Sequence, residues 1–215
     1  MMPAHREPVR IALVEDDAAV LDSLHLYLDG QGHKTVCFTA AEALLAALDC
    51  GGQLDCIVSD VRMPGLCGLE LVHRLNARSV VTPIVLITAH GDVEMAVSAI
   101  KAGAFDFIEK PFEPTRLLVS VRNALEAGGH KPSHTAQELQ SRFKMLSERQ
   151  RQVMELAVVG LSNKEIGSRL NISPKTVEYH RAWVMERIGA KNLAELVRIA
   201  MQINQQTGRR SITFY

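Results

Sequence analysis

Acidic side chains follow two short apolar runs in the first half of the chain. The run Cys56–Ser59 ends in Asp60, and the run Val9–Val14 is followed by Glu15 and Asp16. Neighbouring carboxylates repel one another unless a cation lies among them. Oxygen ligands of this kind suit Mg²⁺, and a carboxylate can attack phosphorus to give an aspartyl phosphate. The residue types therefore indicate magnesium-dependent acceptance of a phosphoryl group.

Two further apolar runs end in residues that would support this chemistry. Ile84–Thr88 closes on a hydroxyl group, and Phe105–Ile108 is followed by Glu109 and Lys110. Lys110 and the metal would neutralise charge on a phosphoryl group in transfer, and Thr88 could donate a hydrogen bond to one of its oxygens. Taken singly, an acid at a strand end is usually an Asx turn or a helix cap. The set predicts function only if folding brings it to one edge.

Short β-rich runs alternate with segments of helical period through residues 1–127. This alternation predicts a parallel sheet with helices on both faces. The pattern from Thr39 to Glu42 is a capping box that would open the second helix. Five strands over about 120 residues fit the flavodoxin-like doubly wound order, in which ligands bind beyond the carboxyl ends of the strands. The predicted strands are Val9–Val14, Lys34–Phe38, Cys56–Ser59, Ile84–Thr88 and Phe105–Ile108, and the last two predicted helices are Val93–Ala102 and Arg116–Ala127.

The pattern changes after residue 127. A Gly-Gly pair followed by Pro and Ser is typical of a linker, and Leu139, Phe143 and Leu146 would share one face of a short amphipathic helix. Helix-start signals then recur without any strand pattern. The predicted divisions are a first domain over residues 1–127, a linker with an amphipathic helix over 128–146, a four-helix domain over 147–204 and a tail over 205–215.

Two helices of the second domain are separated by a tight turn. Ser162 and Glu165 form the capping-box pattern of the first helix, and Ser173-Pro174 is an N-cap followed by proline at the first helical position. A short helix, a tight turn and a longer helix form a helix-turn-helix, whose second helix enters the major groove of DNA. A solvated face of a small helical bundle is the plainer interpretation. The inward residues would be Val177, Val184 and Ile188, and the outward ones Lys175, Glu178, Tyr179, Ala182 and Glu186.

A net charge of zero conceals two opposed halves. Residues 1–127 carry 10 Lys and Arg against 17 Asp and Glu, a net of −7, whereas residues 128–215 carry 14 against 7, a net of +7. A basic module favours a polyanionic partner, although opposite charges would also let the halves attract each other. The sequence contains no apolar run long enough to span a membrane, and its start lacks the apolar core of a signal peptide. We therefore expect a cytoplasmic protein with no membrane partner.

Residues 9–127 resemble the receiver domain of bacterial two-component response regulators. The resemblance lies in IALVEDDAAVLDSL, IVSDVRMPGLCGLEL and PIVLITAHGDVEMAVSAIKAGAFDFIEKPF, the last of which is close to the FixJ group. It implies that Asp60 accepts a phosphoryl group from a histidine kinase. It also implies that Asp16, Asp60 and the backbone carbonyl of Arg62 hold Mg²⁺, with Glu15 where many members have Asp.

The same resemblance assigns three further residues. Lys110 matches the invariant lysine of the family, and Pro111 after it fits the cis-proline usually found there. Thr88 matches the hydroxyl that moves toward the phosphoryl group, and Phe107 matches the aromatic residue that rotates with activation. Two other phosphoryl chemistries fit poorly. A dehalogenase-type phosphatase would have an acid where Arg62 stands, and the chain has no GxxxxGK[ST] motif of a nucleotide hydrolase.

The second half resembles the LuxR/FixJ type of DNA-binding domain, chiefly in LSERQRQV, GLSNKEIG and ISPKTVEYHRAWVMERIGAKN. The resemblance places its base-facing positions on Glu178, Tyr179 and Ala182. Trp183 departs from the smaller or polar residue common there, and we expect it to pack. The phosphate-facing positions would include Lys175, Thr176 and Arg181.

Together these features predict a FixJ-type transcription regulator in which the receiver catalyses only its own phosphotransfer and dephosphorylation. The family resemblance implies that phosphorylation at Asp60 makes the receiver dimerise, so that two basic domains bind double-stranded promoter DNA, with RNA polymerase as a further candidate partner. One alternative is a phosphorylation-independent DNA-binding regulator whose receiver is only a protein-interaction module. Another is a phospho-shuttle or RNA-binding regulator, which preference for duplex DNA and a steep salt dependence would exclude.

Overall fold

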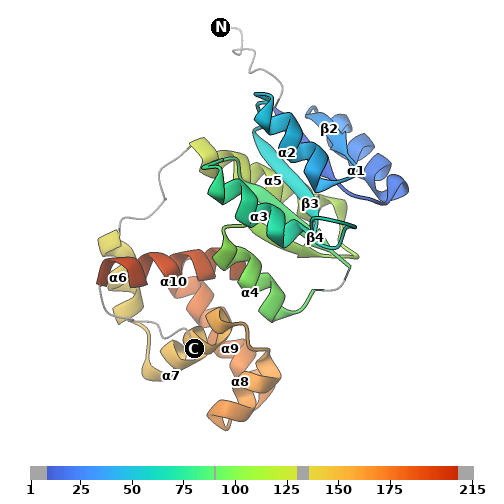
Figure 1. The fold of residues 1–215 in the computed structure, drawn as a ribbon. Helices are drawn as coiled ribbons and strands as arrows, with labels where there is room; N and C mark the ends of the chain where they lie inside the picture. Colours follow the sequence, from blue (N-terminus) through green and yellow to red (C-terminus); the bar gives the residue numbers. More distant parts are fainter. Residues whose placement is uncertain (1–8, 90, 130–135, 208–215) are drawn as a thin grey trace, which may run out of the picture. The chain divides into compact units, whose positions relative to one another are not determined.

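The computed structural model describes residues 9–89, 91–129 and 136–207, and the chain folds into two compact units (Figure 1). One unit comprises Met1–His90 with Ala102–His130, and the other comprises Gly91–Lys101 with Lys131–Tyr215. Over the described ranges, no helix has both the length and the apolar character that crossing a lipid bilayer requires.

A five-stranded parallel sheet forms the centre of the first unit. Its strand order is β2-β1-β3-β4-β5, which confirms the predicted doubly wound fold. The third strand runs one residue farther than predicted, so that Asp60 is its last residue. The strands are β1 Arg10–Val14, β2 Lys34–Phe38, β3 Cys56–Asp60, β4 Ile84–Thr88 and β5 Asp106–Glu109. The helices that alternate with them are α1 Ala18–Gly30, α2 Ala41–Asp49, α3 Gly68–Ala77, α4 Val93–Ala102 and α5 Pro114–Gly129.

Successive strand residues point to opposite faces of the sheet. Leu13, Val58 and Ile87 belong to a buried cluster that also contains the apolar stripes of α1 and α5. Ile57 and Leu86 point to the opposite face of the sheet and are fully buried. On that face α2 contacts β1, β2 and α3 (Figure 1). Burial on both faces fixes the strands, and it thereby fixes the residues at their carboxyl ends.

The remaining described helices confirm the predicted all-α part. Leu139, Phe143 and Leu146 are buried, as the amphipathic pattern predicted. Val153 on the next helix packs with Ile166 and Val177 of the predicted helix-turn-helix in a separate buried cluster. The helices are α6 Ala136–Lys144, α7 Glu148–Val159, α8 Asn163–Leu170, α9 Pro174–Ile188 and α10 Leu193–Thr207.

Gly167 explains how closely α8 and α9 approach at their turn. A Cβ atom on this residue would lie 2.7 Å from the carbonyl oxygen of Ile172, a separation that real Cβ atoms do not adopt. The turn itself is closed by Asn171, which ends α8 in the left-handed conformation at φ 54°. Ser173 then begins α9 by accepting a hydrogen bond from the Thr176 backbone. The tight turn therefore depends on a residue without a side chain.

Three local predictions were wrong. The capping box from Thr39 to Glu42 does not form, because Ala40 is the N-cap of α2 and makes no side-chain cap. Glu42 instead accepts a hydrogen bond from the Leu66 backbone N–H at 2.9 Å. Gly128 and Gly129, interpreted as linker, are the last residues of α5. The predicted tail begins inside α10, which reaches Thr207.

Candidate functional site

The carboxyl edge of the sheet brings the predicted acids and lysine together. Asp60 ends β3, Glu15 directly follows β1 and Lys110 directly follows β5. The Lys110 Nζ donates to Asp60 Oδ1 at 2.8 Å and to Glu15 Oε2 at 2.7 Å. Glu15 and Asp60 are only 3% and 5% exposed. One ammonium group therefore bridges two buried carboxylates that arrive from different strands.

Burial and ion pairing act in opposite directions in this cluster. Burial raises the pKa of the Glu15 carboxyl above its usual range, even though Lys110 donates a hydrogen bond to it. At Lys110, partial burial acts to lower the pKa, but the hydrogen bonds to Asp60 and Glu15 outweigh it and leave the pKa raised. Lys110 is therefore charged at neutral pH and places a positive charge beside Asp60.

The same acids could hold a divalent cation. Glu15, Asp16 and Asp60 each offer a carboxylate oxygen, and these oxygens lie within 4.8 Å of one another. Asp16 is exposed, whereas the other two are buried. The Arg62 backbone N–H donates to Asp60 Oδ2 at 2.6 Å, which orients the second oxygen of that carboxylate. Hard oxygen donors in so small a space suit Mg²⁺, which takes few protein carboxylates and keeps several waters.

Thr88 lies at the adjacent strand end. It is the last residue of β4 and is fully buried. Its backbone carbonyl accepts a hydrogen bond from the Lys110 N–H at 2.7 Å, so that the backbones carrying the hydroxyl and the ammonium group are held together. The Lys110-Pro111 peptide bond is cis, as predicted.

Phe107 lies on β5 and is half-buried. Its neighbour Asp106 is 3% exposed, and Asp106 Oδ2 accepts hydrogen bonds from Arg116 and Ser120 of α5, both at 2.8 Å. This buried cluster ties the strand that carries Phe107 to α5. This cluster was not predicted from the sequence, although an acid between the apolar residues of β5 is a signal that could have revealed it.

The solvent face of α9 carries most of the predicted DNA-contact residues. Lys175 Nζ donates to Glu178 Oε2 at 2.9 Å, and their side chains are 85% and 59% exposed. Thr176 donates its backbone N–H to Ser173 Oγ at 3.0 Å and thereby closes the first turn of the helix. The exposed residues among the predicted contacts are Lys175, Thr176, Glu178, Tyr179 and Ala182.

Arg181 differs from these residues because it is partly buried. Its Nη1 donates to Asn163 Oδ1 at 2.8 Å, and burial lowers the pKa of its guanidinium. Asn163 is the first residue of α8, so that this bond joins the two helices of the helix-turn-helix. A guanidinium has five N–H donors, which leaves others for the phosphate contact that the sequence predicted.

Trp183 packs, as expected, but it packs against side chains of its own helix and not in the core of the described helices. Its exposed fraction is 37%. Its ring packs edge to face against the Tyr179 ring, with the two centroids 6.1 Å apart. The guanidinium of Arg187 lies over the Trp183 ring, 5.9 Å from the ring centroid. The three residues recur every fourth position on α9, which places them along one side of the helix.

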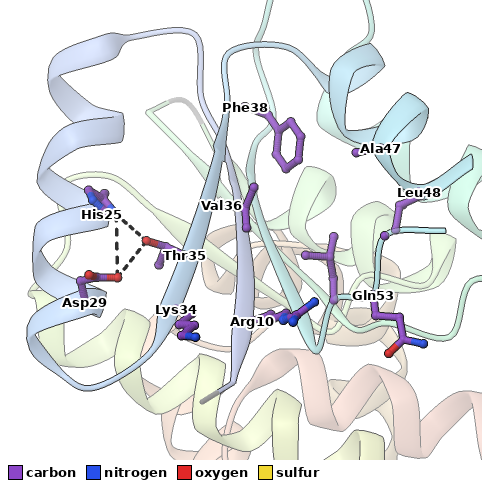
Figure 2. Close-up of a pocket in the computed structure, with 12 residues that line it drawn as sticks. Arg10, His25, Asp29, Lys34, Thr35, Val36, Phe38, Ala47, Leu48 and Gln53 are labelled. Atoms are coloured by element: carbon purple, nitrogen blue, oxygen red, sulfur yellow. Dashed lines mark hydrogen bonds and ion pairs between the residues drawn. The ribbon is translucent and has the colours of Figure 1, made fainter. Parts of the chain in front are cut away.

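A surface groove of about 500 Å³ lies along the edge strand β2, away from the acidic cluster. Figure 2 shows Val36, Phe38 and Leu48 on one side of β2, and the hydrogen-bonded side chains of His25, Thr35 and Asp29 on the other. None of the predicted site residues lines this groove, so the predicted chemistry is concentrated at the carboxyl edge.

Two family models match the chain. The response regulator receiver domain matches residues 11–122, and the luxR family of bacterial regulatory proteins matches residues 144–200. The transcriptional regulatory protein FixJ of Bradyrhizobium diazoefficiens is 47% identical over 194 residues, covering 89% of this chain and 94% of that protein. The response regulator protein TmoT of Ectopseudomonas mendocina is 37% identical over 198 residues, covering 90% of this chain and 88% of that protein.

A solved structure agrees with these matches. The crystal structure of full-length FixJ from B. japonicum is 45% identical, with a TM-score of 0.54, and covers 92% of this chain and 98% of that one. The match to this full-length regulator spans both halves of the chain. The chain belongs to the FixJ family of response regulators, and it is a two-component response regulator that controls transcription.

Proposed function

We propose that Asp60 is the residue that accepts the phosphoryl group, from a histidine kinase. The observation that carries this proposal is the placement of a buried Asp60 carboxylate at the end of β3, with Lys110 Nζ 2.8 Å from Oδ1. A carboxylate oxygen attacks phosphorus, the new oxygen–phosphorus bond forms and the bond from phosphorus to the kinase histidine breaks. The positive charge of Lys110 then faces the oxygens of the transferred group.

Mg²⁺ is the proposed cofactor. Glu15, Asp16 and Asp60 would hold it with their carboxylates, and Arg62 with its backbone carbonyl. The ion would supply positive charge at the transferring phosphoryl oxygens. The proximity of the three carboxylates supports this assignment. Calorimetric titration with Mg²⁺ should show binding to the wild-type protein and affinity at least about tenfold weaker in Asp16→Asn, since loss of even an outer ligand partner costs that much.

Thr88 and Phe107 form the proposed switch. Thr88 ends the strand next to β3, where its hydroxyl can donate a hydrogen bond to a phosphoryl oxygen on Asp60. Phe107 on β5 pairs with Leu86 on β4, the strand that ends in Thr88. A shift of Thr88 would therefore change the position of β5. A phosphoryl group changes the balance between two conformations only through its different interaction with each. Formation of a receiver homodimer is the proposed consequence.

The second half is proposed to bind double-stranded promoter DNA through α9. Glu178, Tyr179 and Ala182 would face base edges, and Lys175, Thr176 and Arg181 would contact phosphates. The net charge of +7 over residues 128–215 and the exposed face of α9 support this assignment. Binding of promoter DNA would require a cytoplasmic location, which we propose together with RNA polymerase as a further partner.

Intact mass after incubation with acetyl phosphate and Mg²⁺ tests the central proposal. Wild-type protein should gain the mass of one phosphoryl group, and Asp60→Asn should gain none. Asp49→Asn is the matched control, because that carboxylate pairs with Arg78 on the surface and should leave phosphorylation unchanged. If Asp60→Asn is still modified, the acceptor lies elsewhere. If phosphorylation leaves oligomeric state and DNA affinity unchanged, the switch is disproved and the phosphorylation-independent regulator is favoured.

A further inference from the structure

The side of α9 that carries Trp183 is unusual for a surface that meets a polyanion. We name Tyr179, Trp183 and Arg187 the aromatic ridge. Tyr179 is 62% exposed and Trp183 is 37% exposed, and their rings meet at an interplanar angle of 63°. Large apolar side chains exposed together usually mark a binding surface. The core does not explain this pair, because the buried residues of α9 are Val177, Val184 and Ile188.

The cations close to the aromatic ridge are already engaged. Lys175 forms an ion pair with Glu178 at 2.9 Å, and Arg181 donates to Asn163 at 2.8 Å. Arg187 lies over the Trp183 ring, where a guanidinium is attracted to the π face. The two exposed rings thus lie on an outward surface that also carries the exposed carboxylate of Glu186, and the nearest cation is held at the edge of the ridge.

Duplex DNA presents one apolar feature in the major groove, the 5-methyl group of thymine. We propose that the aromatic ridge reads thymine methyl groups and that Trp183 is a specificity-determining residue of this chain. The proposal rests on the proposed binding of duplex DNA by α9. Tyr179 lies in the second turn of the helix and Trp183 in the third, so that both rings follow the N-terminal residues into the groove. Arg187, in the fourth turn, would contact a phosphate at the groove edge.

Replacement of thymine by uracil tests this proposal, because it removes the methyl group and keeps every hydrogen-bonding atom of the base. Duplexes are first selected from a random-sequence pool with acetyl-phosphate-treated full-length protein at fixed salt. Each thymine of the selected duplex is then replaced by deoxyuridine. Wild-type protein should bind about fourfold more weakly for each contacted methyl lost, the effect of exposing one buried methyl group. Trp183→Ala should bind thymine and uracil duplexes with equal affinity at the contacted position.

Two controls separate methyl recognition from other losses. Met145→Ala removes another exposed apolar side chain of the helical part, 62% exposed, and should keep the wild-type ratio of affinities. The slope of affinity against salt should be the same for wild type and Trp183→Ala, since no phosphate contact is lost. Thermal melting should show that both variants remain folded, because neither side chain is buried.

Three results would overturn the proposal. Equal binding of thymine and uracil duplexes by the wild type would exclude methyl recognition altogether. An unchanged ratio in Trp183→Ala, with the ratio lost in Tyr179→Ala, would exclude Trp183 as the reader. Failure of the phosphorylated wild type to select any duplex would instead disprove DNA binding itself, and Trp183 would then be assigned to contact with a protein partner.

Discussion

The acidic strand edge and the outer face of α9 use charge in different ways. At the strand edge, Lys110 bridges Glu15 and Asp60, and both acids are at most 5% exposed. On α9, Lys175 pairs with Glu178 while both side chains stay mainly in solvent. The first arrangement is held by the sheet before any partner arrives. The exposed ion pair on α9 can be broken at a small cost in free energy, because water replaces the lost partner. This suits a surface that must accommodate another molecule.

Removing the lysine from each pair should give the largest contrast. Lys110→Met leaves two buried carboxylates without their cation and should lower the free energy of unfolding of the first unit by about 3 kcal/mol in metal-free buffer. Lys175→Met should cost less than about 0.5 kcal/mol in the second unit, because exposed ion pairs contribute little. Urea unfolding followed by circular dichroism measures the first change. The fluorescence of Trp183, the single tryptophan, measures the second.

Added Mg²⁺ sharpens this prediction. If the metal lies among Glu15, Asp16 and Asp60, it should restore much of the stability lost in Lys110→Met and leave Lys175→Met unchanged. Equal costs for the two substitutions would show that the strand edge is as hydrated as the surface of α9, which would remove the contrast.

A smaller effect is expected where the backbone, rather than charge, holds the second site. Gly167→Ala would bring a Cβ atom to 2.7 Å from the Ile172 carbonyl oxygen, and the resulting shift should cost about 1–3 kcal/mol and weaken DNA binding. Gly30→Ala, at the end of α1, meets no atom within 4 Å and should be neutral or stabilise slightly. Trp183 fluorescence and circular dichroism in urea give the two values. If Gly167→Ala kept the wild-type stability, the turn between α8 and α9 could widen without loss of free energy of unfolding.

The smallest effect tests helix starts, one in each unit. Ser162 caps α8, and Glu165 completes its capping box, so Ser162→Ala should lower the free energy of unfolding by about 1 kcal/mol. Thr39 has the same sequence pattern but makes no cap, so Thr39→Ala should change stability by only a few tenths of a kcal/mol. Thermal denaturation of each variant compares them. If Thr39→Ala lowered the free energy of unfolding by as much as Ser162→Ala, Thr39 would cap α2 in solution, as the sequence pattern suggested.

The strand edge was predictable because its signals are local. Each strand is a short apolar run, and the residue after the run is at the carboxyl edge by the geometry of a parallel sheet. Asp60, Lys110 and Thr88 could therefore be placed together before any coordinates were known. The cap at Thr39 does not form because Ala40 is the N-cap of α2, and Glu42 bonds instead to the Leu66 backbone, which is 24 residues away. Sequence pattern does not show such competition between distant groups.

The face of α9 was predictable only in outline. Its inward residues follow helical spacing, and Val177, Val184 and Ile188 are buried as expected. What the outward side chains contact depends on neighbours outside the helix or on their own rotamers. Arg181 is engaged by Asn163 from α8, and Trp183 packs on Tyr179 rather than in the core. Periodicity gives the direction of a side chain, but it does not identify the partner.

The packing of α6 determines where the DNA-binding half of the chain begins as a transferable module. The family match for the DNA-binding half begins at residue 144, yet Leu139 and Phe143 are already buried upstream of it, and α6 packs against both α9 and α10. A gene fusion that begins the transferred half at Ser147 would expose the apolar surface that α6 covers. A transferable DNA-binding module of this chain therefore has to include α6 as well as the four helices that follow it.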